Sequence, residues 1–340
     1  MMAPPPHRDS HMSIKTLALA ALCAGFAALA IVATLPVAAQ GSFPARPIRI
    51  LIPFPPGGAA DLIGRTIGEK LAAQLGQPVV MDNRPGAGGV LATDLLAKAE
   101  PDGYTLMVGM AGPIVISPNL NKHLSYNVER DLMPVTRVSE VVNVMVVNAA
   151  NGVTTVKEFI GWAKQRPGEV RFGSSGPGQP DHLAGEFFKR LTGIEMTHVP
   201  YKGGAPALVD LISGQIQLTF STYIVAQPHL KSGRLRALAV ITPERQPLVP
   251  DLPAVAESVA GFGLNNWNGI FAPARAPKDV VQRLFAEINR ALQASDLKQR
   301  QNAAGIEVVG SPSVEDFRRF VRVDAARWGK IIKDAGIELE

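Results

Sequence analysis

The feature that most constrains this chain is a strand–loop–helix plan that occurs twice. The segments are "IRILIPFPPGGAADLIGRTIGEKL" (48–71) and "VRFGSSGPGQPDHLAGEFFKRL" (170–191). Each begins as an apolar run, passes through a loop rich in glycine, proline or serine, and reaches an aspartate, Asp61 or Asp181, where the helical spacing starts. Two such units predict two lobes, each with a loop that feeds a helix N-terminus.

Short β-like runs alternate with helical patterns along most of the chain, which favours α/β layers with parallel strands. Glycine follows the last periodic residue of several helices, at Gly76, Gly193 and Gly214. We predict strands at 48–53, 78–81, 104–108, 141–147, 170–173, 196–201, 216–221 and 235–241. We predict helices at 61–75, 89–98, 155–165, 181–192, 205–213, 278–294 and 313–334. The runs at 141–149 and 264–274 are expected to connect the lobes.

The N-terminal region has the pattern of an export signal. An uncharged apolar run at 16–35 follows Lys15, and small residues stand at Val37 and Ala39. This predicts a signal peptide over residues 1–39, cleaved near Ala39. The rival interpretation is a retained membrane anchor, because about 20 apolar residues can span a bilayer. Met12 is an alternative start to Met1.

Composition excludes several classes of site. Cys23 is the only cysteine and lies inside the predicted signal, so the mature chain would have no disulfide, thiol nucleophile or thiolate metal site. Removing residues 1–39 lowers the formal net charge from +5 to +4, because Arg8, Lys15 and Asp9 go with them. That charge is scattered, so it gives no nucleic-acid footprint.

The glycine-rich loops are candidate anion sites. A helix N-terminus has unpaired N–H groups and a partial positive charge, and a loop without bulky side chains lets an anion reach them. The candidates are Gly57 and Gly58, the run Ser174, Ser175 and Gly176, and small residues after a strand at 108–118. The alternative for each loop is a tight turn that merely precedes a helix.

Two acidic residues and one histidine have open roles. Asp61 and Asp181 are expected to be N-caps, each contributing about 1 kcal/mol, with contact to a ligand amino group as the alternative. His182 is either a ligand contact or a cap residue. Lys202 in "YKGG" is expected to be solvated.

Enzyme motifs do not appear. There is no G-x-S-x-G elbow and no H-E-x-x-H, and "NRPGAGG" (83–89) lacks the full dinucleotide-loop spacing. We therefore expect no catalytic residue, no cofactor and no metal.

Five motifs occur in order: "IPFPPGGAAD", "DNRPGAGGVLATDLLAKAEPDGYTL", "FGSSGPGQPDHLAGEFF", "VPYKGGAPALVDLISGQIQLTF" and "WNGIFAPARAP". They resemble the solute-binding proteins of tripartite tricarboxylate transporters, the Bug family of extracytoplasmic receptors. The resemblance covers residues 43–340.

The resemblance implies a two-lobed α/β periplasmic-binding-protein fold of type II-like topology, with two hinge crossings and helices on both faces of each sheet. It implies one lobe from 43–142 and 266–340 and a second from 143–265. The ligand-binding residues that it implies, with those expected from the loops, are Phe54, Gly57, Gly58, Asp61, Ala111, Pro113, Ser174, Ser175, Gly176, His182, Ser221 and Thr222. Arg84 is expected to be structural or to face a permease.

The expected function is that of a monomeric periplasmic receptor that delivers a small carboxylate to membrane permease subunits. The sequence has no arginine cluster, so we expect a mono- or dicarboxylate, an acidic amino acid or an aromatic acid. The alternatives are an exported sensory receptor for an organic acid and an α/β enzyme acting on a carboxylate.

Overall fold

A computed structural model describes residues 43–336 of the chain, together with Met1 and Ala3. The predicted signal peptide and its cleavage near Ala39 lie outside the described residues, apart from these two. Two β-sheets organise the described chain. Among the described residues no helix has both the length and the apolar character that spanning a membrane requires.

The first sheet has six strands in the order β11-β4-β10-β3-β1-β2. The strands are β1 (Ile48–Ile52), β2 (Val79–Asn83), β3 (Thr105–Met110), β4 (Leu132–Val141), β10 (Trp267–Pro273) and β11 (Ile306–Val308). β1 pairs in parallel with β2 and β3, whereas β10 lies antiparallel between β3 and β4. One of the two central strands of this sheet, β10, therefore comes from late in the sequence.

The second sheet has five strands in the order β7-β6-β8-β5-β9. The strands are β5 (Asn143–Asn148), β6 (Arg171–Ser174), β7 (Thr197–Pro200), β8 (Leu218–Thr222) and β9 (Leu235–Val240). β6 pairs in parallel with β7 and β8, and β5 lies antiparallel between β8 and β9. Both sheets thus combine the predicted parallel strands with antiparallel strands that the sequence did not predict.

The chain crosses between the sheets twice, after β4 and before β10. Asn143 begins β5 and Asn266 precedes β10, and the Nδ2 of Asn266 donates to the Oδ1 of Asn143 at 3.0 Å. The Nδ2 of Asn143 in turn donates to the backbone oxygen of Phe220 at 3.2 Å. Because the Phe220 oxygen can only accept, these two hydrogen bonds fix the orientation of both side-chain amides. They also link the two crossings.

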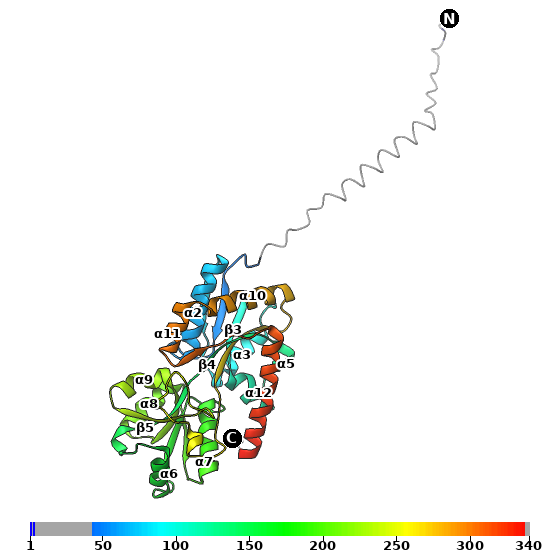
Figure 1. The fold of residues 1–340 in the computed structure, drawn as a ribbon. Coiled ribbons are helices and arrows are strands. Elements are labelled where there is room, and N and C mark those ends of the chain that lie inside the picture. Colours follow the sequence, from blue (N-terminus) through cyan, green and yellow to red (C-terminus); the bar gives the residue numbers. More distant parts are fainter. Residues whose placement is uncertain (2, 4–42, 337–340) are drawn as a thin grey trace. The chain divides into compact units, whose positions relative to one another are not determined.

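Helices cover both sheets (Figure 1). Those around the first sheet are α2 (Ala59–Leu75), α3 (Val90–Ala97), α4 (Ser117–Leu120), α5 (Val128–Asp131), α10 (Lys278–Leu292), α11 (Ser295–Asn302) and α12 (Val314–Ala335). Those around the second are α6 (Val156–Lys164), α7 (Pro180–Thr192), α8 (Gly204–Ser213) and α9 (Tyr223–Lys231). Short helical turns include η1 (Ala87–Gly89) and η2 (Gly112–Ile116).

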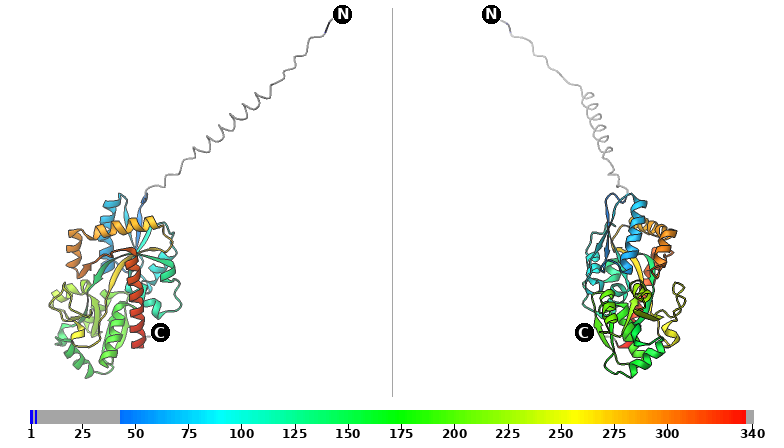
Figure 2. Two further views of the ribbon diagram at one scale, coloured as in Figure 1. Left: turned by 45° about the vertical axis from the view of Figure 1, so that its right-hand side comes forward. Right: turned by 90° about the vertical axis from the view of Figure 1, so that its left-hand side faces the viewer.

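Alternate side chains of each sheet face different helices, as the two-residue period of a strand requires. In β1, Leu51 belongs to a buried cluster with Leu96 of α3, whereas Ile52 lies beneath Gly64 of α2. In Figure 2 the α2 helix and the α10–α11 segment accordingly lie together on one side of their sheet.

The second sheet behaves in the same way. Met145 joins the cluster that contains residues of α6 and α7, and Val146 joins the cluster that contains residues of α8. Both faces of each sheet are therefore buried under helices, as predicted.

Candidate functional site

A cavity of about 440 Å³ lies between the two sheets. Its lining comes from residues 54–60, which lead into the first turn of α2, and residues 202–206, which lead into the first turn of α8. The first residues of α7, the end of β8 with α9, and both crossings complete it. Six of the predicted ligand residues line it: Phe54, Gly57, Gly58, Ser175, Ser221 and Thr222. The structure thus brings together residues more than 160 positions apart in the sequence.

The start of α2 presents backbone amides rather than side chains to this cavity. Gly58 is the N-cap and makes no side-chain cap bond, so the first amides of α2 have no side-chain partner there. A Cβ placed on Gly58 would meet nothing within 4 Å. Gly57 has φ +95°, which favours glycine, and its N–H donates to the Oδ2 of Asp61 at 3.1 Å. The amide of Gly57, predicted to face an anion, is therefore used inside the loop.

Asp61 is not the N-cap that the sequence predicted. The helix begins at Ala59, two residues earlier than expected, so Asp61 is its third residue. Helical propensity of the alanines extends the helix to the glycine pair. The carboxylate still reaches back to a backbone N–H, as the third residue of a helix often does.

The Asp61 carboxylate is turned to the chain itself. It accepts from the Nε of Arg65 at 2.9 Å and from the Nδ2 of Asn83 at 3.0 Å. Burial raises the pKa of Asp61, but the hydrogen bonds from Arg65, Asn83 and Gly57 outweigh burial, and the pKa lies below its ordinary value. Asp61 does not line the cavity.

The loop before α7 uses most of its donors internally. Ser174 is fully buried, and its Oγ lies 2.6 Å from the Nε2 of His198. The N–H of Gly176 donates to the same Oγ at 3.2 Å. Ser174 and Gly176 do not line the cavity, whereas Ser175 between them does.

Asp181 also differs from its predicted place. Gln179 is the N-cap of α7 and Pro180 its first residue, a position that suits proline, so Asp181 is the second residue. Its carboxylate accepts from the Ser175 N–H at 2.6 Å and the Ser175 hydroxyl at 2.9 Å. Asp181 is therefore not the N-cap of α7; its carboxylate instead holds Ser175 in the preceding loop.

The electrostatic setting of Asp181 is unusual because no ion pair of the described chain involves it. Burial raises its pKa to about 6, and the hydrogen bonds from Ser175 and the His182 amide offset this only in part. Asp181 lines the cavity, so its charge faces the place where a ligand would lie.

Two histidines lie behind this loop. The rings of His182 and His198 stack with centroids 4.0 Å apart, and both stack on Phe172. Burial lowers the pKa of each to about 4, so both rings are neutral near pH 7. The Nδ1 of His182 accepts from the Gly178 N–H at 3.2 Å, and His182 does not line the cavity.

Of the other predicted ligand residues, two line the cavity and two do not. Ala111 and Pro113 follow β3 in the buried start of η2 and do not line the cavity, although the neighbouring Met110 does. The Pro113 oxygen accepts from the Tyr126 hydroxyl at 2.6 Å, which indicates a packing role. Ser221 and Thr222 line the cavity where β8 ends and α9 begins.

Sequence reasoning missed the start of α8. Gly203 is its N-cap, with no side-chain cap bond, and residues 202–206 line the cavity from the second sheet. The signal was the glycine pair in "YKGG", which parallels Gly57 and Gly58. Lys202 is exposed, as expected, and it is also the one basic residue of the lining in the described chain.

The polar residues of the crossings were also missed. Asn143, Asn266 and Gln179 line the cavity. The Oδ1 of Asn266 is buried and has no hydrogen-bond partner among the described residues. Nothing in the local sequence marks these residues, because their roles depend on the meeting of the two sheets.

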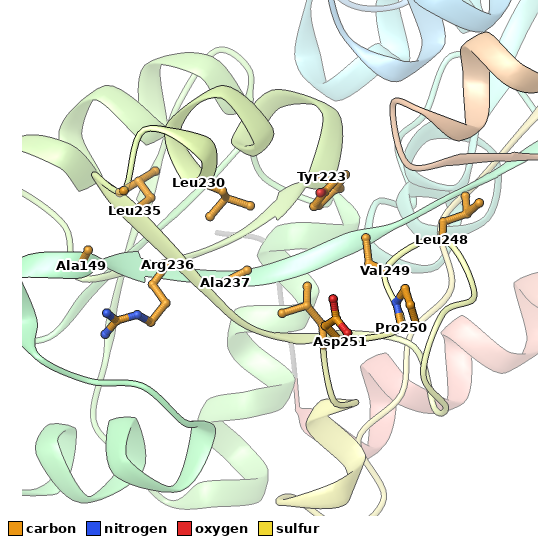
Figure 3. A pocket seen from close by; sticks show the side chains of 12 residues that line it. Ala149, Tyr223, Leu230, Leu235, Arg236, Ala237, Leu248, Val249, Pro250 and Asp251 are labelled. Carbon is orange, nitrogen blue, oxygen red and sulfur yellow. The ribbon is translucent and has the colours of Figure 1, made fainter.

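A second cavity, of about 500 Å³, lies on the five-stranded sheet alone (Figure 3). Leu230, Leu235 and Ala237 line it together with the segment 248–252. It contains no helix N-terminus with a glycine pair, and the Arg236 guanidinium donates to the Val153 oxygen at 2.9 Å. The cavity between the sheets is therefore the candidate ligand site. No cluster of three or more potential metal ligands occurs in the described part of the chain.

The structure has two helix-covered β-sheets joined by two crossings, and two helix N-termini without side-chain caps face the cavity between them. This arrangement is that of the two-lobed solute-binding proteins. The chain matches the model of the "Tripartite tricarboxylate transporter family receptor" over residues 63–337, and it belongs to that family. The predicted resemblance is thereby confirmed.

Individual relatives agree with this assignment. Protein BugT of Bordetella pertussis is 36% identical over 308 residues, which cover 90% of this chain and 94% of BugT. The solved structure of R. palustris Rpa4515 with adipate has a TM-score of 0.83 and 36% identity, covering 87% of this chain and 99% of that one. MatC (Rpa3494) from Rhodopseudomonas palustris with bound malate has a TM-score of 0.79 and 31% identity, covering 85% and 100%. These similarities confirm the predicted two-lobed periplasmic-binding-protein fold.

Proposed function

We propose that this protein is a non-catalytic periplasmic receptor that captures a small carboxylate and delivers it to the membrane permease of a tripartite tricarboxylate transporter. The observation that carries the proposal is the pair of helix starts, α2 and α8, which face one cavity from different sheets without side-chain caps. Unpaired amides at a helix start stabilise negative charge. Two such starts suit a carboxylate at each end of the cavity.

The rest of the lining sets the class of ligand. The charged residues that line the cavity within the described chain are Asp181 and Lys202. Apolar side chains, among them Phe54, Met110 and Val225, supply much of the remainder. A compact organic acid with an apolar body fits this lining, whereas a polyphosphate would lack neutralising charge. Related proteins solved with adipate and malate support a dicarboxylate; acidic amino acids and aromatic acids remain in the class that we propose.

The proposed lobes follow the two sheets. Lobe 1 consists of 43–142 and 266–340, and lobe 2 of 143–265. A ligand held by α2 of lobe 1 and α8 of lobe 2 stabilises the closed arrangement by its higher affinity for it. The proposed ligand contacts are residues 57–60 at the start of α2, residues 203–205 at the start of α8, Ser175, Ser221 and Thr222. The proposal includes export with removal of residues 1–39, and action as a monomer without cofactor.

A thermal-shift panel at fixed neutral pH tests this function. Dicarboxylates, tricarboxylates, acidic amino acids, aromatic acids, sugars and nucleotides are compared on protein that has been unfolded and refolded to remove any retained ligand. A ligand at about a thousand times its dissociation constant adds roughly 4 kcal/mol of stability. We expect a small acid to raise the melting temperature by several degrees and to be recovered unchanged. A sugar or nucleotide as the sole hit, or turnover of the acid, would contradict the proposal.

A further inference from the structure

Gln179 joins the two proposed lobes through its side chain. We propose that it is a positioning residue that holds the lobes closed around the cavity. The inference rests on the proposed function, because it assigns to Gln179 the retention of the captured ligand. It does not depend on which acid is bound.

The contact is short and buried. Gln179 stands at the start of α7 in lobe 2 and is 1% exposed. Its Nε2 donates to the backbone oxygen of Gly88, in η1 of lobe 1, at 2.7 Å. Both residues lie outside the two crossings, so the bond must break when the lobes move apart.

Lobe 1 has a recess that matches the Gln179 side chain. A Cβ placed on Gly112 would lie 2.7 Å from the Oε1 and 3.0 Å from the Cδ of Gln179. A Cβ placed on Gly88 would lie 2.5 Å from its Nε2. Two glycines therefore leave the space that the amide fills, and any side chain at Gly112 would push it out.

The role of Gln179 within its own lobe is small. It occupies the N-cap position of α7 but makes no side-chain cap bond there. The neighbouring Gly178 also adjoins lobe 1, since a Cβ there would lie 3.6 Å from the Oγ of Ser117. Truncating Gln179 therefore removes a contact between lobes without removing a helix cap.

Dissociation kinetics distinguish a closing contact from a merely structural one. In Gln179→Ala we expect the dissociation rate of the acid found by the panel to rise by about tenfold, the effect of losing one buried hydrogen bond with its packing. The association rate should change less than twofold, because the ligand enters before the contact forms. Gln227→Ala is the matched control: the Gln227 Nε2 also bonds across the lobes, to the Ala303 oxygen at 3.1 Å, but at an exposed site. We expect the control to change both rates by less than twofold.

Gly112→Ala tests the recess from the other side. The added methyl group meets only Gln179 among its three nearest atoms, so this variant should also speed dissociation. In the double variant the Gln179→Ala substitution removes these three atoms, so the dissociation rate should not exceed that of the faster single variant. Gly161→Ala, on the exposed face of α6 with open space around it, controls for the glycine replacement itself.

A distance measurement without ligand separates this inference from the proposed function. Spin labels on L95C in α3 and L191C in α7, in the processed chain that lacks Cys23, report the separation of the lobes at positions that are 37% and 39% exposed. We expect a short-distance population in the unliganded protein that Gln179→Ala depletes and Gln227→Ala leaves unchanged. If no carboxylate binds the wild-type protein, the function fails but this measurement still decides the role of Gln179. Unchanged distances, unchanged dissociation, or effects of the two substitutions that multiply would each overturn the inference.

Discussion

The loops that enter α2 and α7 share one sequence plan, but the structure holds their aspartates in opposite environments. Asp61 pairs with Arg65, and its hydrogen bonds keep its pKa low. Asp181 accepts only neutral donors, and burial raises its pKa to about 6. The first carboxylate is a neutralised anchor that faces away from the cavity, and the second is an unneutralised group on the cavity wall.

The difference also separates two uses of a glycine-rich loop. Before α2, the aspartate takes the Gly57 amide and leaves the first turn of the helix without a side-chain cap beside the cavity. Before α7, Ser175 is bonded to Asp181, and Ser174 lies against His198. A shared motif therefore identifies two related supersecondary units without showing which loop keeps free donors. Four predictions test this comparison.

Replacing Gly58 by leucine should have the largest effect, and on binding rather than folding. Its φ of −84° suits any residue and its Cβ position is open, so the melting temperature should change little. The new side chain would stand between the ligand and the amides of α2, and we expect a loss of affinity of about 100-fold, near 3 kcal/mol. Calorimetric titration measures this, with Gly161→Leu as control. If the Gly58→Leu variant binds with wild-type affinity, the loop before α2 is only a turn and does not contact the ligand.

Asp181→Asn should show a pH-dependent effect on stability. The folded protein holds the Asp181 proton more tightly than the unfolded chain does, so this carboxyl contributes less to the unfolding free energy as pH rises from about 4 to about 6. Asparagine cannot ionise, and the stability of the variant relative to wild type should rise across this window by on the order of 2 kcal/mol. Urea unfolding at pH 4.5, 5.5 and 6.5 measures the trend. A constant difference would mean that the Asp181 pKa is ordinary.

His198→Gln, behind the same loop, should make the stability of the protein depend less on pH in the acid range. The pKa of His198 is about 4 in the folded protein, below its ordinary value of 6.5, so the unfolded chain takes up the proton first and stability falls as pH drops from 6.5 to 4. Removing this group should reduce the slope by up to about 1 kcal/mol per pH unit. The glutamine amide carries both a donor and an acceptor, so it keeps a hydrogen-bonding group for the Ser174 hydroxyl whichever of the two donates. The same slope in both proteins would show that His198 is not held neutral.

Asp61→Asn should have the smallest effect. The variant loses a charged partner for the half-exposed Arg65 and should be less stable by about 1 kcal/mol. Because the Asp61 pKa is lowered, this deficit should be present at neutral pH and shrink as pH falls below about 4, opposite to the trend for Asp181→Asn. Affinity should stay within threefold, because Asp61 does not line the cavity. A large loss of affinity at unchanged stability would instead make Asp61 a ligand contact.

Local pattern predicted the regular elements well and the site only in part. The periodic runs predicted β1, β5 and most of the longer helices, whereas β4, β10, β11, α9 and α11 were missed. β10 lies within the run 264–274, which was expected only to connect the lobes. β4 contains Pro134 at an irregularity in its pairing with β10, and α9 contains Pro228. Proline is a poor signal for either element, and tertiary packing overrides it here.

The contacts in and behind the site that escaped prediction depend on long-range pairing. Parallel pairing of β6 with β7 places His198 opposite Phe172 and so brings its ring to Ser174. The donors at the start of α8 reach the cavity only because the second sheet packs against the first. No window of the sequence contains both partners of these contacts.

The position of β10 has a consequence for how the chain acquires its structure during synthesis. All five strands of the second sheet come from residues 143–240, so every residue of those strands is made before the residues of β10. The first sheet is still incomplete at that stage, because β10 (Trp267–Pro273) must enter between β3 and β4. Until it does, the facing edges of β3 and β4 are unpaired, and such edges are templates for association with other chains. A nascent or truncated chain ending before Trp267 would therefore contain every strand of the second sheet but lack β10 and β11 of the first.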